Sequence, residues 1–128
     1  MNKGLYVGKE VVKILTNNVE LKELIGSKIY PLVADANTTL PFIVYRRSGL
    51  SLLNSKDKFL FNSSVVMDLI IASDSYENSI DCLDKVVKAL IEKKNAAECG
   101  IDRIELVECS EDFVDDCYVQ NIQIQIKF

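Results

Sequence analysis

Apolar residues recur at helical spacing in two segments of the chain. In residues 5–15 they stand three or four positions apart, which predicts a first helix, and Asn18 is expected to cap a short second turn that ends at Gly26. Residues 76–93 are predicted to form a longer helix, with Asp74 as its N-cap. The apolar stripe of this helix consists of Tyr76, Ile80, Leu83, Val87 and Leu90.

Alternating apolar and polar positions, rich in β-branched and aromatic residues, predict strands elsewhere. The predicted strands are residues 29–32, 42–47, 65–72, 101–109 and 118–128. The alternation slips near Leu106 and Val107, where a β-bulge is expected. Residues 94–100 are expected to form a loop, and residues 112–116 an acidic turn. The last strand alternates strictly, as antiparallel strands with one solvated face do, but the pattern leaves open whether it lies at a sheet edge or inside.

This order of elements predicts a single α+β domain over residues 1–128. We expect a mainly antiparallel sheet of four to five strands, with two helices packed on one face. The long connection at residues 50–62 adds a projecting hairpin or arm. Exposed apolar side chains on such a connection usually have a partner, so it is a candidate subunit-interface arm, with an ordinary amphipathic hairpin as the alternative. Its candidate residues are Leu50, Leu52, Leu53, Lys56, Lys58, Phe59 and Phe61.

Composition narrows the possible chemistry. With 15 basic and 19 acidic residues the net charge is −4, which does not attract phosphate backbones or anionic lipid headgroups, so neither specific nucleic-acid binding nor a membrane role is expected. The absence of histidine removes the commonest general base and metal ligand. The five glycines match no phosphate-binding loop. We therefore predict no catalytic residue, cofactor or metal site, and no enzymatic activity.

The cysteines and the adjacent arginines, Arg46 and Arg47, are not expected to form a chemical site. The four cysteines are too widely spaced for a zinc ribbon or a redox motif, and no signal peptide or membrane span is evident. We expect reduced thiols in the cytosol, with Cys82 and Cys109 in or near the core.

Arg46 and Arg47 should point to opposite faces of their strand. An ion pair within the chain is the simplest interpretation of these arginines, and an intersubunit contact is the alternative.

Acidic residues gather before the last strand. A calcium-binding loop would need regularly spaced carboxylates and a glycine for the sharp turn, and that pattern is absent. A solvated strand face and turn is the simplest interpretation, and an acidic contact or lumen surface is the alternative. The candidate residues are Glu108, Glu111, Asp112, Asp115 and Asp116.

Several segments, in order along nearly the whole chain, resemble the tail-completion or tail-terminator proteins of long-tailed bacteriophages and prophages. The matching segments are Val11-Val12, Ile29-Tyr30-Pro31, Leu40-Pro41-Phe42-Ile43-Val44-Tyr45, Val65-Val66-Met67-Asp68, Ser75-Tyr76-Glu77, Glu111-Asp112-Phe113 and Tyr118-Val119-Gln120-Asn121-Ile122. These are core and turn residues, so the resemblance transfers no functional residue.

The resemblance implies a structural protein of the virion tail or neck, assembled in the cytoplasm of a bacterial host. Such proteins form a homo-oligomeric ring, typically a hexamer, on the last ring of tail-tube protein. The ring stops tube polymerisation and joins the tail to the head–tail connector protein. DNA passes through the ring, and a negatively charged lumen would not retain it. The alternatives are another head–tail joining component of the neck, or a small-molecule-binding regulatory module of similar α+β topology, which would need a pocket with convergent polar groups.

Overall fold

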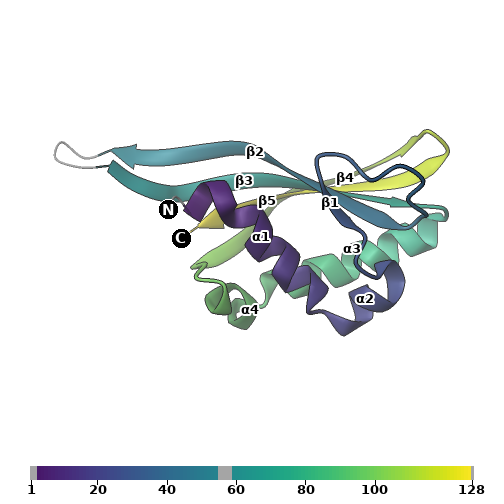
Figure 1. Ribbon diagram of the computed structural model, residues 1–128, viewed down its shortest axis with the longest axis horizontal. Helices are drawn as coiled ribbons and strands as arrows, with labels where there is room; N and C mark the ends of the chain where they lie inside the picture. The colour runs from purple at the N-terminus through teal and green to yellow at the C-terminus, as the bar shows by residue number, and fades with distance from the viewer. Residues whose placement is uncertain (1–2, 55–58, 128) are drawn as a thin grey trace.

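In the computed structural model, which describes residues 3–54 and 59–127, four helices cover one face of a five-stranded sheet (Figure 1). The elements are α1 (Lys3–Thr16), α2 (Val19–Ile25), β1 (Ile29–Pro31), β2 (Phe42–Asn54), β3 (Phe59–Ser73), α3 (Tyr76–Ile91), α4 (Lys93–Glu98), β4 (Arg103–Val114) and β5 (Cys117–Lys127). The strand order is β1-β2-β3-β5-β4, with β1 parallel to β2 and the other neighbours antiparallel. The predicted α+β class and mainly antiparallel sheet are confirmed.

The hydrophobic core lies between the helices and the sheet. Successive strand side chains point to opposite faces, so alternate residues of β3 and β5 share the helix-covered face. On β3 these are Val65, Met67, Leu69 and Ile71, and on β5 they are Ile122, Ile124 and Ile126, all fully buried. From α1 the core receives Val7, Val11, Ile14 and Leu15, at the spacing predicted from sequence.

Helix ends follow local capping chemistry. The Asn18 side chain accepts a hydrogen bond from the Leu21 N–H at 2.9 Å, and Gly26 ends α2 with φ of 63°, so both predictions are confirmed. The N-cap of α3 is Ser75, one residue later than predicted. The Ser75 hydroxyl accepts a hydrogen bond from the Asn78 N–H at 3.1 Å. It therefore has the capping role that was predicted for Asp74.

The buried face of α3 is rotated from the predicted stripe. Tyr76 and Ile80 are 48% and 39% exposed, and Leu83 and Val87 are only partly buried. The buried residues of α3 are Ser79, Cys82, Val86, Ala89 and Leu90. Most of these are small, so the helix axis can lie close to β3 and β5. The predicted stripe was wrong in part because it was chosen from the large apolar residues of the helix. A short helix, α4, occupies the predicted loop at residues 94–100 and buries Ala96.

Two hairpins are longer than their sequence patterns predicted. The strand predicted at residues 42–47 does not end there, because β2 continues through Ser48 and Gly49 to Asn54, with a register shift between Arg47 and Gly49. A glycine in a strand commonly marks such a bulge. In the other hairpin, β4 runs through Asp112 to Val114, so the acidic turn is shorter than predicted.

The turn between β4 and β5 consists of Asp115 and Asp116, both with positive φ, as a two-residue hairpin turn of type I′ requires. The bulge predicted near Leu106 is confirmed by a register shift between Leu106 and Glu108. The last strand, β5, lies inside the sheet between β3 and β4, which answers the question its sequence pattern left open.

Candidate functional site

The β2–β3 hairpin projects beyond the helix-covered part of the sheet, so the predicted hairpin-like connection is confirmed as a structural element (Figure 1). Its strands pair as far out as Asn54 with Phe59, and Leu50 pairs with Val65 at the base. Leu50, Leu52 and Leu53 belong to β2, and Phe59 and Phe61 to β3. The candidate residues Lys56 and Lys58 lie outside the described residues.

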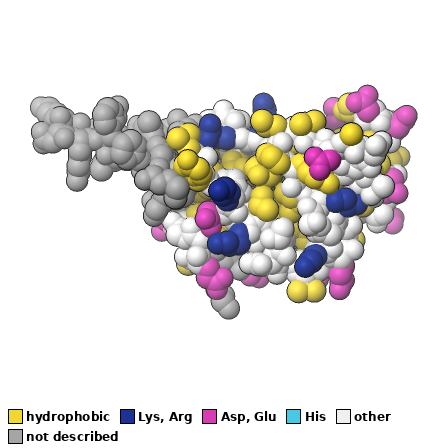
Figure 2. All heavy atoms as spheres, in the orientation of Figure 1, with side chains coloured by type: hydrophobic (Ala, Val, Ile, Leu, Met, Phe, Trp, Pro, Cys, Tyr) yellow, Lys and Arg dark blue, Asp and Glu magenta, His cyan; other side chains and the backbone are white. Residues whose placement is uncertain are grey.

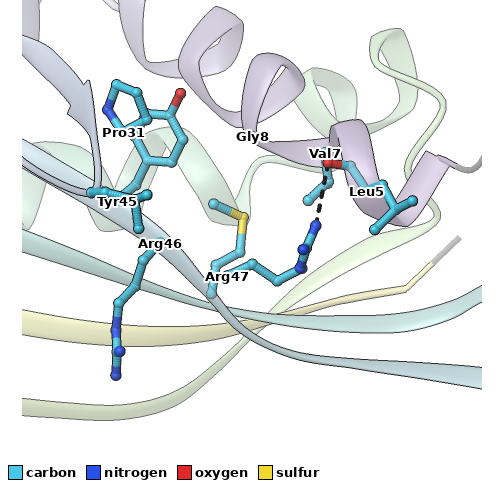
Figure 3. Close-up of a pocket in the computed structure, with 9 residues that line it drawn as sticks. Leu5, Val7, Gly8, Pro31, Tyr45, Arg46 and Arg47 are labelled. Carbon is cyan, nitrogen blue, oxygen red and sulfur yellow. Dashed lines mark hydrogen bonds between the residues drawn. The ribbon is translucent and has the colours of Figure 1, made fainter.

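A groove of about 350 Å³ lies at the root of this arm, between α1, the end of β1 and β2 (Figure 3). We call it the root groove. It is lined by Leu5, Val7, Gly8, Pro31, Leu32, Tyr45, Arg46, Arg47 and Met67. A Cβ at Gly8 would come within 2.9 Å of the Tyr45 ring, so the glycine permits α1 to approach β2 closely. Except for the arginines and one tyrosine, the lining is apolar.

The rim of the root groove exposes large apolar side chains. Leu5 of α1 and Leu32 after β1 line the groove and are 50% and 74% exposed, and their chain neighbours Tyr6 and Val33 are 49% and 74% exposed. Figure 2 shows hydrophobic side chains gathered in the middle of the face that carries α1 and β1, with Lys and Arg side chains among them. Apolar patches of this kind on a small protein commonly mark an interaction surface.

Arg46 and Arg47 point to opposite faces of the sheet, as predicted (Figure 3). Arg47 turns toward α1 and donates to the Leu5 carbonyl at 3.4 Å. On the uncovered face Arg46 Nε donates to Asp68 Oδ2 at 2.9 Å, and the amide of Gln123 donates to the other oxygen at 3.1 Å. This confirms the intrachain ion pair for Arg46, whose charge is thereby balanced within the chain. Both arginines line the root groove, but it is the Arg47 guanidinium that turns toward α1.

The acidic candidates are all exposed, and the β4–β5 turn, which carries two of them, lies at the end of the molecule opposite the arm (Figure 1). Glu108, Glu111 and Asp112 are in β4, and Asp115 and Asp116 form the turn. Strand register divides the β4 members between the two faces of the sheet. Glu108 and Asp112 pair with residues of the uncovered face, whereas Glu111 pairs with buried Gln120 of the helix face.

Glu111 ties the acidic hairpin to the start of α3. Its carboxylate accepts from the Tyr76 hydroxyl at 2.9 Å and from the Gln120 amide at 3.2 Å. The hydrogen bond to Glu111 raises the pKa of Tyr76. The Tyr118 ring lies 6.1 Å from the Tyr76 ring and 4.9 Å from the Phe113 ring, centroid to centroid. These contacts hold Tyr76 in one position although half of its surface is exposed.

A second groove, of about 480 Å³, follows the outer face of α3 beside this cluster. We call it the α3 groove. It is lined by Tyr76, Glu77, Ile80, Asp81 and Asp84. Asp81 and Asp84 pair with Lys85 and Lys88 of the same helix at 2.8 and 3.0 Å. The lining therefore combines two exposed apolar residues with three carboxylates.

Within residues 3–54 and 59–127, no group of acidic or cysteine side chains is arranged to hold a metal ion. Among the helices of that part of the chain, none has both the length and the apolar character needed to cross a membrane.

The prediction that Cys109 is near the core is wrong. It is exposed, because β4 is an edge strand whose outer residues extend past the helices.

Cys82 is expected to resist alkylation in the folded protein, whereas Cys109 and Cys117 are expected to react. Burial raises the pKa of the Cys82 thiol to about 12, so at about pH 8 it stays protonated and enclosed, and the thiolate is the reactive form. Mass spectrometry after iodoacetamide treatment measures the occupancy of each site. Labelling in urea is the control, and equal labelling of Cys82 and Cys109 without urea would contradict the burial of Cys82.

Comparison with known proteins extends the fold description. No protein-family model matches the sequence, and no curated protein matches it. Among solved structures, the chain is similar to one named "Virion of native gene transfer agent (GTA) particle", with a TM-score of 0.70 and 12% identity over 91% of this chain and 90% of that chain. At this identity the similarity shows a shared fold. A chain of an H-NOX mutant aligns with a TM-score of 0.36 and 12% identity, over 98% of this chain and 55% of that chain, and supports no inference.

Proposed function

We propose that this chain is a structural protein of a phage-like particle that forms a homo-oligomeric ring at the end of the tail tube. The ring, expected to be a hexamer, stops tube polymerisation and joins the tail to the head–tail connector. The observation that carries the proposal is the fold shared, over about nine tenths of both chains, with a chain of a gene transfer agent virion. The tail-terminator resemblance of the ordered sequence segments supports the same role.

The surface features support assembly as the activity. The molecule carries a projecting hairpin, an apolar root groove and an exposed acidic hairpin at the opposite end (Figure 1). Different surfaces at opposite ends suit a head-to-tail contact, which generates a closed ring when the rotation between copies closes. In such a ring the acidic hairpin is our candidate for the channel wall, where a negative surface would not retain passing DNA.

Another component of the head–tail junction is the alternative function. The similar structure is that of a whole particle, and its name gives no position for the matching chain, so the shared fold favours both assignments equally. In either case the protein would assemble in the cytoplasm of a bacterial host and end in the tail or neck of the particle. The binding partner distinguishes the two, because a terminator binds tail-tube protein directly.

Light scattering after size-exclusion chromatography tests the proposal, with the chain alone and mixed with tail-tube protein from the same genome. The monomer mass is 14.4 kDa. We expect a discrete multiple of that mass, either alone or once tube protein is present, since some rings close only on a partner. A mass of one chain under both conditions would refute the ring, and assembly without affinity for tube protein would favour the alternative component.

A further inference from the structure

We propose that the root groove of one copy binds the α3 groove of the next copy, so that the two grooves form the subunit contact of the proposed ring. The inference rests on the proposed function, because it assigns surfaces to an assembly that the proposal requires. The partner at both grooves is a second copy of this chain. Three observations carry it: matched apolar surfaces, opposite charges, and placement in different parts of the molecule.

Each groove exposes two large apolar side chains to solvent. Leu5 and Leu32 stand at the rim of the root groove, 50% and 74% exposed. Tyr76 and Ile80 stand in the α3 groove, 48% and 39% exposed. Burying apolar area at the centre of a contact supplies most of its favourable free energy, and aromatic residues are enriched there. Contact between the two grooves would thus bury the exposed apolar side chains of both.

The charges around the grooves are opposite. Arg47 lines the root groove, and Lys9 of α1 lies one helical turn from Leu5. No carboxylate is among the described residues that line this groove. The α3 groove is lined by three carboxylates, of which Glu77 makes no ion pair within the described part of the chain. A guanidinium suits such a contact because it pairs with carboxylates in a fixed planar geometry.

The same charges disfavour pairing of either groove with itself. In a two-fold symmetric dimer built on the α3 groove, the Glu77 carboxylates of both copies would lie in one contact, and like charges across an interface cost several kcal/mol. The root groove lies beside the arm, while α3 starts near the β4–β5 turn at the other end of the molecule (Figure 1). Pairing unlike surfaces at different ends is heterologous, the kind of contact that builds rings.

Both grooves are rigid enough to be recognised. Tyr45 is held against Gly8 in the root groove, and the Arg47 guanidinium is oriented by the Leu5 carbonyl (Figure 3). In the α3 groove the Tyr76 hydroxyl is fixed by Glu111. Side chains already held in position lose less conformational entropy when a partner binds.

Charge reversal tests the contact. The variants are Arg47→Glu, Glu77→Lys and the double variant, with Lys22→Glu and Glu23→Lys on exposed positions of α2 as matched controls. Each single groove variant is expected to raise the protein concentration at half-assembly about tenfold or more, because like charges then face each other. The double variant, and a 1:1 mixture of the two single variants, are expected to assemble as the unmodified chain does. Circular dichroism and thermal melting confirm that each variant is folded.

The outcomes separate this inference from the proposed ring. If the unmodified chain assembles but the single groove variants match the α2 controls, the groove pairing is wrong and the ring stands. If the double variant is weaker than both singles, the two residues do not face each other and the pairing is again wrong. If the unmodified chain stays a monomer even with tube protein, the ring itself is refuted. If the 1:1 mixture assembles, both single variants must be folded, because misfolded chains would not form the contact. The loss of assembly in each single variant is then due to its changed charge.

Discussion

Replacing Leu90 by alanine is expected to lower the free energy of unfolding by about 2–5 kcal/mol, the range for removing a buried leucine from a packed core. Leu90 is 1% exposed and packs in the hydrophobic core beneath the sheet. The substitution leaves a cavity that its neighbours fill only in part. The midpoint and slope of urea unfolding, followed by circular dichroism, measure the change.

Leu83→Ala in the same helix is the matched control. It removes the same atoms and changes helix propensity equally, but Leu83 lies at the margin of the core and is only partly buried. We expect a loss of about 1–2 kcal/mol, since part of its side chain already contacts water. Equal losses at the two positions, or a larger loss at Leu83, would mean that α3 buries the stripe predicted from sequence and not the rotated face.

Shortening the arm is expected to abolish the ring and leave a folded monomer. Because Leu50 pairs with Val65, residues 51–64 can be replaced by Asn-Gly, which forms a two-residue hairpin turn between paired positions. We expect a mass of one chain by light scattering, with the far-ultraviolet circular dichroism of a folded α+β protein, whether or not tail-tube protein is present.

A second variant separates arm length from arm chemistry. Leu52→Ser with Leu53→Ser keeps the hairpin and removes apolar side chains from the candidate arm. An arm that docks on a neighbour through these residues should lose assembly in this variant too. If the shortened chain assembles at the same concentration as the unmodified chain, the arm has no part in the ring, and the groove contact alone would have to account for assembly.

The candidate surfaces differed in how far they could be predicted. The arm was predicted because apolar residues in a long connection lack an obvious place in the core. The root groove was missed, because Leu5, Leu32 and Arg47 are distant in sequence and only the packing of α1 on β2 brings them together. A signal was present in Gly8, a glycine inside a helix, which often marks close approach of a neighbouring element.

The α3 groove was missed for a different reason. Tyr76 and Ile80 were assigned to the core because they share a helical stripe with Leu90, whereas the small residues Ser79 and Ala89, which are buried, were not assigned to it. Helix periodicity reports how apolar residues are distributed around an axis, but not how closely that axis approaches the sheet. Close approach selects small side chains, and the larger ones next to them then remain at the surface.

By itself the sequence determined the order and type of most elements, the buried strands β3 and β5, and the caps of α2. These depend on alternation, helical spacing and turn chemistry, which act over a few neighbouring residues. Only the tertiary structure decided that β2 continues through Gly49, that β5 lies inside the sheet, and which face of α3 is buried. Strand partners and helix contacts come from distant parts of the chain, and their packing energies outweigh the local preferences on which sequence patterns rest.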